Sequence, residues 1–337
     1  MVLQQKTVTM SDVARHAGVG KITVSRALRT PGKVSPETLK RIKAAVAELG
    51  YVLDETAAAL SSQRSRTVGA LVSTLEQPVF SSTIRGLNEG LRSANLQLLL
   101  ATTRYQPETE AELIPTLLGR RPEALVLTSS NHTKAARDLL SASDTPTVEL
   151  WELPESPICA AVGFSNRDAA RTITRHLIDT GRRNIAYLCT DRPEDTRAKL
   201  RHQGYLDAIA TTQQQRALFV PVTADETGAD QGAKGFLEIR NRWPDTDAIV
   251  CVSDALGLGA WCEAMRQGAR VPDDIAITGF GDFDYTGASG IGLTTVHIDG
   301  EKIGQTAADL ICQSSDGADI RGQRIDIGFS LVRRTTG

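Results

Sequence analysis

The sequence predicts an all-α helix-turn-helix headpiece followed by an α/β core whose parallel sheets form two lobes. Two observations predict this division. Three short helical patterns fill the first fifty residues, and from residue 67 onward short apolar strands alternate with helices in two successive series. Such alternation implies parallel sheets with right-handed crossovers. A chain of 337 residues also exceeds what one hydrophobic core usually serves, so two or three units are expected.

Local signals between residues 9 and 29 predict two helices joined by a tight turn. Thr9 followed by Asp12 is a typical helix start, in which the side chains satisfy free backbone N–H groups. Gly18 can adopt a positive φ and end the first helix. Gly20 is an acceptable N-cap for the second.

The second helix has an apolar face and a cationic face. Val24, Ala27 and Leu28 are expected to point inward. The residues expected to point outward are Lys21, Ile22, Ser25, Arg26 and Arg29. Such a helix suits the major groove of DNA, where base edges accept hydrogen bonds from arginine and lysine. The alternative is an amphipathic hairpin with a solvated basic face.

A third helix makes that alternative less favourable. Ser35 is a suitable N-cap, Pro36 suits the first helical position, and Gly50 can end the helix. Ile42 and Val46 fall on one face between these signals. Three helices of this size form a minimal DNA-binding headpiece, and residues 54–60 follow as a weak helix too short to be stable alone.

The charge distribution agrees with this interpretation. Residues 1–66 carry 11 Lys and Arg against 5 Asp and Glu, a net charge of +6, whereas the whole chain carries −2, which leaves −8 for the remainder. A basic head on an acidic body concentrates the attraction for phosphate on the head.

Composition argues against other classes of protein. The five histidines and five cysteines are scattered without ligand spacing, so neither a metal nor another cofactor is expected. There is no G-x-S-x-G, Walker or Rossmann motif after a strand, so an enzyme is not expected. The first residues are not an apolar signal segment and no apolar run approaches membrane-spanning length. We therefore expect a cytoplasmic protein without membrane contact.

The core contains two series of apolar runs that predict strands. The first series covers residues 68–72, 96–100, 124–127 and 147–150, and the second covers 184–188, 217–220, 248–252 and 275–278. Ligands of open α/β sheets bind beyond the carboxyl ends of the strands. One candidate there is the pair Arg197 and Arg201, one helical turn apart, because two guanidiniums suit a carboxylate. A solvated helix face that includes Lys199 is the alternative.

The order of several motifs resembles the lactose/galactose-repressor (LacI/GalR) family of bacterial transcription regulators. The motifs are D-V-A-x-x-A-G-V from Asp12, T-V-S-R from Thr23, V-S-P-E-T from Val34, E-L-G-Y from Glu48 and A-x-x-L ending at Leu60. The similarity extends over nearly the whole chain. It implies a helix-turn-helix headpiece, a hinge helix and a bilobed core like that of periplasmic binding proteins, with the ligand between the lobes.

The resemblance also implies domain boundaries. The headpiece would cover residues 6–53, the hinge helix and linker 54–66, and the effector-binding and dimerisation core 67–337. Within the core, the N-terminal lobe (N-lobe) would comprise about 67–164 and 298–322. The C-terminal lobe (C-lobe) would comprise about 165–297 and 323–337.

By the same resemblance, the headpiece would bind a palindromic operator in double-stranded DNA as part of a homodimer. Lys21, Ile22 and Arg26 should face base edges, with Thr23 and Ser25 nearer the phosphates. Thr9 and Lys33 complete the predicted headpiece contacts. Leu60 in the hinge should wedge into the minor groove and kink the central step.

The expected effector contacts follow the strands. Arg201 precedes Gly204-Tyr205 at the family's spacing for a ligand-binding arginine. Phe80 corresponds to an aromatic that reaches the ligand, or else to plain core. Ser129 and His132 lie in a polar loop and have surface-loop chemistry as their alternative. The remaining candidates are Glu149, Thr227, Ser253 and Asp282, and Asp254 is expected to cap the helix that follows Ser253.

Departures from the family pattern favour an anionic ligand. Gly279-Phe-Gly-Asp282 replaces G-[YF]-D-[DN], so the acid that holds sugar hydroxyls is missing or displaced by one position. Fewer acids beside two arginines would suit a ligand anion. Similarity to the gluconate-operon repressors rests on the runs Leu127–Thr133, Val148–Leu150 and Ala161–Asn166.

These observations predict a repressor of a sugar-acid catabolic operon, released from DNA by gluconate or a related acid. Two alternatives stay open. One is a family member that responds to a neutral sugar or another small metabolite, and the other is a carbohydrate-binding sensor that does not regulate DNA. A transport binding protein is not expected, because it would need a signal segment that the first residues do not form.

Overall fold

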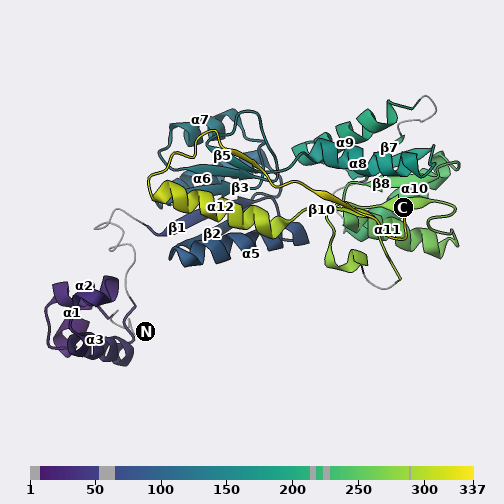
Figure 1. The fold of residues 1–337 in the computed structure, drawn as a ribbon. Coiled ribbons are helices and arrows are strands. Elements are labelled where there is room, and N and C mark those ends of the chain that lie inside the picture. The colour runs from purple at the N-terminus through teal and green to yellow at the C-terminus, as the bar shows by residue number, and fades with distance from the viewer. Residues whose placement is uncertain (1–7, 53–64, 213–217, 223–227, 288–289) are drawn as a thin grey trace, which may run out of the picture. The chain divides into compact units, whose positions relative to one another are not determined.

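The computed structural model describes residues 8–52, 65–212, 218–222, 228–287 and 290–337. The chain divides into two compact units, residues 1–65 and 66–337 (Figure 1). Within the described residues, no helix is long and apolar enough to cross a membrane.

The headpiece consists of three α-helices and a short 3-10 turn. These are α1 (Met10–His16), α2 (Lys21–Arg29), η1 (Pro31–Lys33) and α3 (Pro36–Leu49). The predicted helix signals are confirmed: Thr9 N–H donates to Asp12 Oδ2 at 3.0 Å, and Thr38 N–H donates to the N-cap hydroxyl of Ser35. Gly18 and Gly50 have φ of +64° and +63° and follow the ends of α1 and α3. The core of this unit comprises Val13, Ala14, Ala17, Val24, Ala27, Ile42 and Ala45.

The N-lobe of the second unit is a six-stranded parallel sheet in the order β11-β5-β4-β3-β1-β2. Its strands are β1 (Thr67–Val72), β2 (Gln97–Thr102), β3 (Ala124–Leu127), β4 (Thr147–Leu150), β5 (Ala160–Gly163) and β11 (Arg324–Asp326). The helices are α5 (Pro78–Ser93), α6 (Pro107–Leu118), α7 (Lys134–Ala142) and α12 (Gly300–Ser315). α5 packs on α12, and α6 packs on α7 with its own apolar cluster.

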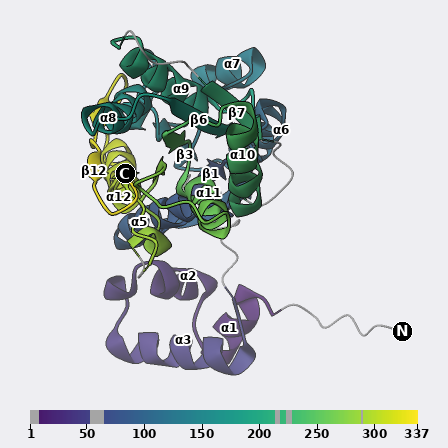
Figure 2. The ribbon, with the colours of Figure 1, turned by 90° about the vertical axis from the view of Figure 1, so that its right-hand side faces the viewer.

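The C-lobe is built around a four-stranded parallel sheet in the order β7-β6-β8-β9. The strands are β6 (Ile185–Thr190), β7 (Leu218–Val222), β8 (Ala248–Cys251) and β9 (Ala276–Thr278). α8 (Asn166–Asp179) packs on α9 (Thr196–Ile209), and α10 (Gly228–Arg242) packs on α11 (Asp254–Arg266) (Figure 2). A short antiparallel pair, β10 (Thr295–His297) and β12 (Ser330–Val332), and the 3-10 turn η2 (Asp284–Gly287) complete the lobe.

Gly204 explains how closely α9 can approach α8. A Cβ atom at this position would lie 2.0 Å from the carbonyl oxygen of Arg167 on α8. Next to it, the buried Tyr205 donates its hydroxyl to the carbonyl of Ile185 at the start of β6. The glycine and the tyrosine therefore fix α9 against the C-lobe sheet. This helix carries Arg197 and Arg201, so their backbone positions are fixed as well.

Two expectations about the core are corrected. Residues 323–337 were assigned to the C-lobe, but Arg324–Asp326 pairs with Ala161–Gly163 at the edge of the N-lobe sheet. The apolar runs that predict strands also do not include β5, because its four small residues (Ala-Ala-Val-Gly) give no strong apolar signal although all four are buried. The chain consequently passes from one lobe to the other between β5 and α8, between β10 and α12, and between β11 and β12.

Candidate functional site

The exposed face of α2 carries the residues predicted to read base edges. Ile22 is 75% exposed, and Lys21 and Arg26 are exposed near it. Val24 and Ala27 are buried against the other helices. The packing of the headpiece therefore does not account for Ile22, whereas an apolar side chain beside two cations suits base edges and thymine methyl groups.

The other predicted DNA contacts are placed less uniformly. Thr23 and Ser25 are half-buried, and Lys33 is exposed in η1. Thr9 is exposed, but its hydroxyl donates to Asp12 Oδ2 at 2.6 Å. Leu60, which is predicted to contact DNA, and Thr227, which is predicted to contact the effector, lie outside the described residues.

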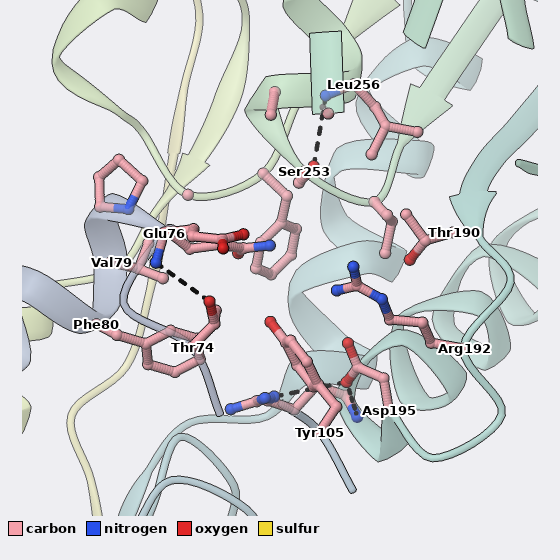
Figure 3. Close-up of a pocket in the computed structure, with 18 of the residues that line it drawn as sticks. Thr74, Glu76, Val79, Phe80, Tyr105, Thr190, Arg192, Asp195, Ser253 and Leu256 are labelled. Carbon is pink, nitrogen blue, oxygen red and sulfur yellow. Dashed lines mark hydrogen bonds and ion pairs between the residues drawn. The ribbon is translucent and has the colours of Figure 1, made fainter. Parts of the chain in front are cut away.

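A cleft of about 840 Å³ lies between the two lobes of the core (Figure 3). Its lining includes N-cap or first-turn residues of five helices, α5 and α6 from the N-lobe and α9, α10 and α11 from the C-lobe. The positive ends of these helix dipoles converge on the cleft because it lies beyond the carboxyl ends of the parallel strands. The backbone therefore favours a ligand that carries negative charge.

Arg201 lines the cleft and is held on three sides. Its Nε donates to Asn166 Oδ1 at 2.8 Å, its Nη1 donates to the carbonyl of Val252 at 2.9 Å, and its guanidinium lies 3.8 Å from the ring centroid of Phe280. Burial lowers the pKa of Arg201. Within the described part of the chain it forms no ion pair with a carboxylate, so this cation is fixed in place with its charge unpaired.

Arg197 also lines the cleft, but it reaches from the C-lobe to the N-lobe. Its Nη1 donates to the carbonyl of Thr128 at 2.6 Å and its Nη2 donates to Ser73 Oγ at 3.1 Å. Its Nε lies 3.6 Å from Asp195 Oδ1. Both terminal nitrogens of Arg197 are therefore engaged between the lobes, and it does not form a free pair with Arg201 for one carboxylate.

Phe80 and Ser253 line the cleft as predicted, and each also has a structural role. Phe80 is buried and packs edge-on against Trp151, with ring centroids 5.7 Å apart. Ser253 Oγ accepts a hydrogen bond from the N–H of Leu256 and so caps α11. The prediction that Asp254 caps α11 is wrong: this buried carboxylate accepts from Phe283 N–H at 2.8 Å and from Thr295 Oγ1 at 2.5 Å, and burial raises its pKa to about 6.

The effector roles predicted for His132 and Glu149 are corrected by their burial. Neither residue belongs to the cleft lining. The His132 side chain is 1% exposed, with Nδ1 2.5 Å from Glu110 Oε1 and Nε2 3.2 Å from Glu149 Oε1. Burial opposes the charge of His132, but the two carboxylates outweigh it and raise its pKa to about 9. Glu149 also accepts from Ile158 N–H at 2.6 Å, so the network joins α6, β4 and the loop after β3.

Ser129 and Asp282 are likewise not part of the cleft lining. Ser129 Oγ accepts from the N–H of Asn131 inside its own loop. Asp282 pairs with Arg334 at 2.6 Å and with His297 at 2.9 Å. Both side chains are therefore engaged in holding loops in place.

Sequence reasoning missed several residues of the cleft. Four carboxylates line it, so the expectation of a pocket poor in acids was wrong; they are Glu76, Asp191, Glu194 and Asp195. Tyr105 and Trp151 also line the cleft. Both residues have a positive φ, which no sequence motif indicates. The position of Asp191 and Arg192 directly after β6 is the one signal that could have pointed to them.

Comparisons with known proteins agree with both units. Residues 9–54 match the sequence family "Bacterial regulatory proteins, lacI family", and residues 65–333 match "Periplasmic binding proteins and sugar binding domain of LacI family". The chain belongs to the LacI family. The predicted fold class, a helix-turn-helix headpiece with a two-lobed parallel-sheet core, is thereby confirmed.

Individual LacI-family relatives cover nearly the whole chain. The HTH-type transcriptional regulator GntR of Pseudomonas aeruginosa is 32% identical over 330 residues, which are 97% of this chain and 94% of the relative. A LacI-family regulator from Silicibacter pomeroyi has a TM-score of 0.90 at 28% identity, covering 98% of this chain and 99% of that one. The lac repressor dimer bound to operator and the anti-inducer ONPF has a TM-score of 0.85 at 26% identity, covering 98% and 99%. These LacI-family relatives are DNA-binding regulators of transcription, and so is this chain.

The exposed face of α2 leads to a prediction about sequence readout. Arg26→Ala should weaken binding to the specific site by about 1–3 kcal/mol and change binding to random DNA little, because a base-edge contact is lost. The measurement is a gel-shift titration with the chain's own promoter region and with random DNA. Lys43→Ala, an exposed cation on α3, is the matched control. Equal losses on both DNAs would mean that Arg26 contacts only phosphate.

The buried His132 network leads to a prediction about pH. The folded-state pKa of about 9 lies above the unfolded value of 6.5, so the stabilisation is fully present below pH 6.5 and is lost as pH rises through 9. The free energy of unfolding of the core should fall by roughly 3 kcal/mol over this range, and by much less in His132→Gln. Urea unfolding from pH 6 to 10 measures it. The same slope in both proteins would contradict this account.

Proposed function

We propose that this protein is a homodimeric repressor of a sugar-acid catabolic operon. Its headpieces bind a palindromic operator, and a gluconate-type sugar acid in the cleft releases it from DNA. The observation that carries the effector assignment is Arg201, a half-buried cation in the cleft without a carboxylate partner among the described residues. A charge-assisted hydrogen bond to a ligand carboxylate would supply that partner.

The surroundings of Arg201 support an acid that also carries hydroxyl groups. The convergent helix N-termini favour negative charge. Glu76 and Asp191 line the same cleft and offer acceptors for ligand hydroxyls. A ligand with one carboxylate and several hydroxyls uses both features, whereas a neutral sugar leaves Arg201 without a counter-charge.

The contacts between the lobes support a response to the ligand. Thr196 Oγ1 donates to Glu152 Oε1 at 2.7 Å, and Asn131 Nδ2 donates to the carbonyl of Glu194 at 3.0 Å. With the two bonds of Arg197, these contacts join the start of α9 to N-lobe loops. A ligand bound between the lobes would favour the lobe angle that it fits, and DNA and ligand would then weaken each other by the same factor.

DNA binding through the headpiece is supported by the exposed cationic face of α2 and by the net charge of +6 on residues 1–66. The lac repressor, a structural relative, is described as a dimer bound to operator. The wedge at Leu60 stays a prediction. A neutral sugar is the second candidate effector, because the four carboxylates of the cleft would also accept hydroxyl groups.

Removing the unpaired cation tests this proposal. Arg201→Ala should bind gluconate at least tenfold more weakly, since a charge-assisted hydrogen bond contributes about 1.5–3 kcal/mol. It should still bind the promoter DNA but no longer be released by gluconate. Calorimetry with gluconate and glucose, with and without that DNA, measures both effects.

Arg175→Ala, an exposed arginine on α8 outside the cleft, is the control and should behave like the unaltered protein. Two results would refute the sugar-acid assignment: glucose binding as tightly as gluconate, or Arg201→Ala with undiminished affinity for the acid.

A further inference from the structure

Tyr105 enters the cleft from an unusual turn at the end of β2. The N–H of Gln106 donates to the carbonyl of Thr103 and closes the turn. Between them, Arg104 and Tyr105 have φ of +52° and +64°, two consecutive left-handed residues that are not glycine. Each such residue costs roughly 1–2 kcal/mol, and residues of this kind cluster where a side chain has a functional position. Here the turn directs the Tyr105 hydroxyl into the pocket (Figure 3).

The ring of Tyr105 belongs to the N-lobe but lies near two cations of the C-lobe. The guanidinium of Arg192, in the loop after β6, is 4.9 Å from its centroid, and that of Arg197, on α9, is 5.7 Å away. Both distances are within the range in which a cation is attracted to an aromatic ring. The ring thus contacts the C-lobe close to the hydrogen bonds that Arg197 makes between the lobes.

The hydroxyl of Tyr105 is protonated and available. Burial raises its pKa, so it stays a hydrogen-bond donor at neutral pH. No hydrogen bond from this hydroxyl to another described residue is present, whereas two neighbouring polar groups are engaged: Ser253 caps α11 and Asp195 caps α9. This hydroxyl belongs to a half-buried side chain in the cleft lining, so it can donate a hydrogen bond to a ligand oxygen.

We infer that Tyr105 is a specificity-determining residue of the cleft, which donates a hydrogen bond to an oxygen of the bound ligand while its ring contacts Arg192 and Arg197. The inference rests on the proposed function, in which Arg201 binds the carboxylate of a sugar acid. Arg201 on the C-lobe and Tyr105 on the N-lobe then contact different oxygens of one ligand. This selects a polyhydroxy acid over a simple aliphatic acid.

Removal of the hydroxyl alone is the closing test. Tyr105→Phe should bind gluconate roughly 3- to 10-fold more weakly in calorimetry, the loss expected for one hydrogen bond. The matched control is Tyr187→Phe, which deletes a buried hydroxyl that has no partner and does not line the cleft. Its affinity for gluconate should be unchanged.

The outcomes separate this inference from the proposed function. If the unaltered protein binds neither gluconate nor 2-ketogluconate, the sugar-acid function fails. If it binds them and Tyr105→Phe binds equally well, only the role of the hydroxyl is overturned.

The contact of the ring with the two arginines is tested without ligand. Tyr105→Leu should melt roughly 2–4 °C below Tyr105→Phe, since it keeps an apolar side chain but loses the aromatic face. Equal melting temperatures would overturn the ring contact.

Discussion

The hydrogen bonds of Asn166 fix the geometry on which the cleft depends. Asn166 is the first residue of α8, directly after the first passage of the chain from the N-lobe to the C-lobe. Its Nδ2 donates to the carbonyl of Trp151 at the end of β4, and its Oδ1 accepts from Arg201 Nε. One buried carboxamide thereby joins the residue that follows β4, the crossover and the cation that lines the cleft. A buried amide that loses one of its hydrogen bonds lowers the stability of the folded protein. The position of Arg201 therefore depends on the hydrogen bonds of Asn166 at this crossover between the lobes.

The two arginines of α9 lie one turn apart but make different contacts. Arg197 uses its donors on Thr128 and Ser73 of the N-lobe. Arg201 donates to Asn166 and Val252 of the C-lobe and keeps its charge unpaired. A ligand anion meeting Arg201 therefore acts next to the bonds that hold the lobes together. On the proposed function, ligand binding and lobe angle would be coupled through this one helix, without a longer path through the protein.

Local signals in the sequence were sufficient for the headpiece and for most of the core. Thr9, Gly18 and Ser35 act within a few residues of where they stand, so their roles were predictable. β11 could not be predicted, because Arg324–Asp326 becomes a strand only through pairing with β5, about 160 residues earlier in the chain. His132 looked like a ligand residue because its type fitted, yet its contacts with Glu110 and Glu149 come from tertiary packing. The position of the Tyr105 side chain in the cleft depends on a positive φ, which tyrosine rarely adopts.

The two proposed sites use charge in different ways, as their burial requires. The cations of α2 are exposed on a unit of net charge +6, and interactions of such groups with DNA phosphates are strongly screened by salt. In the cleft, four carboxylates stand beside four arginines, Arg104, Arg192, Arg197 and Arg201, so net charge cannot attract an anion. Selection of an anion there would come from groups in fixed positions, the half-buried Arg201 and the helix N-termini, whose interactions salt screens less. Ionic strength would therefore alter operator binding without altering which effector the cleft accepts.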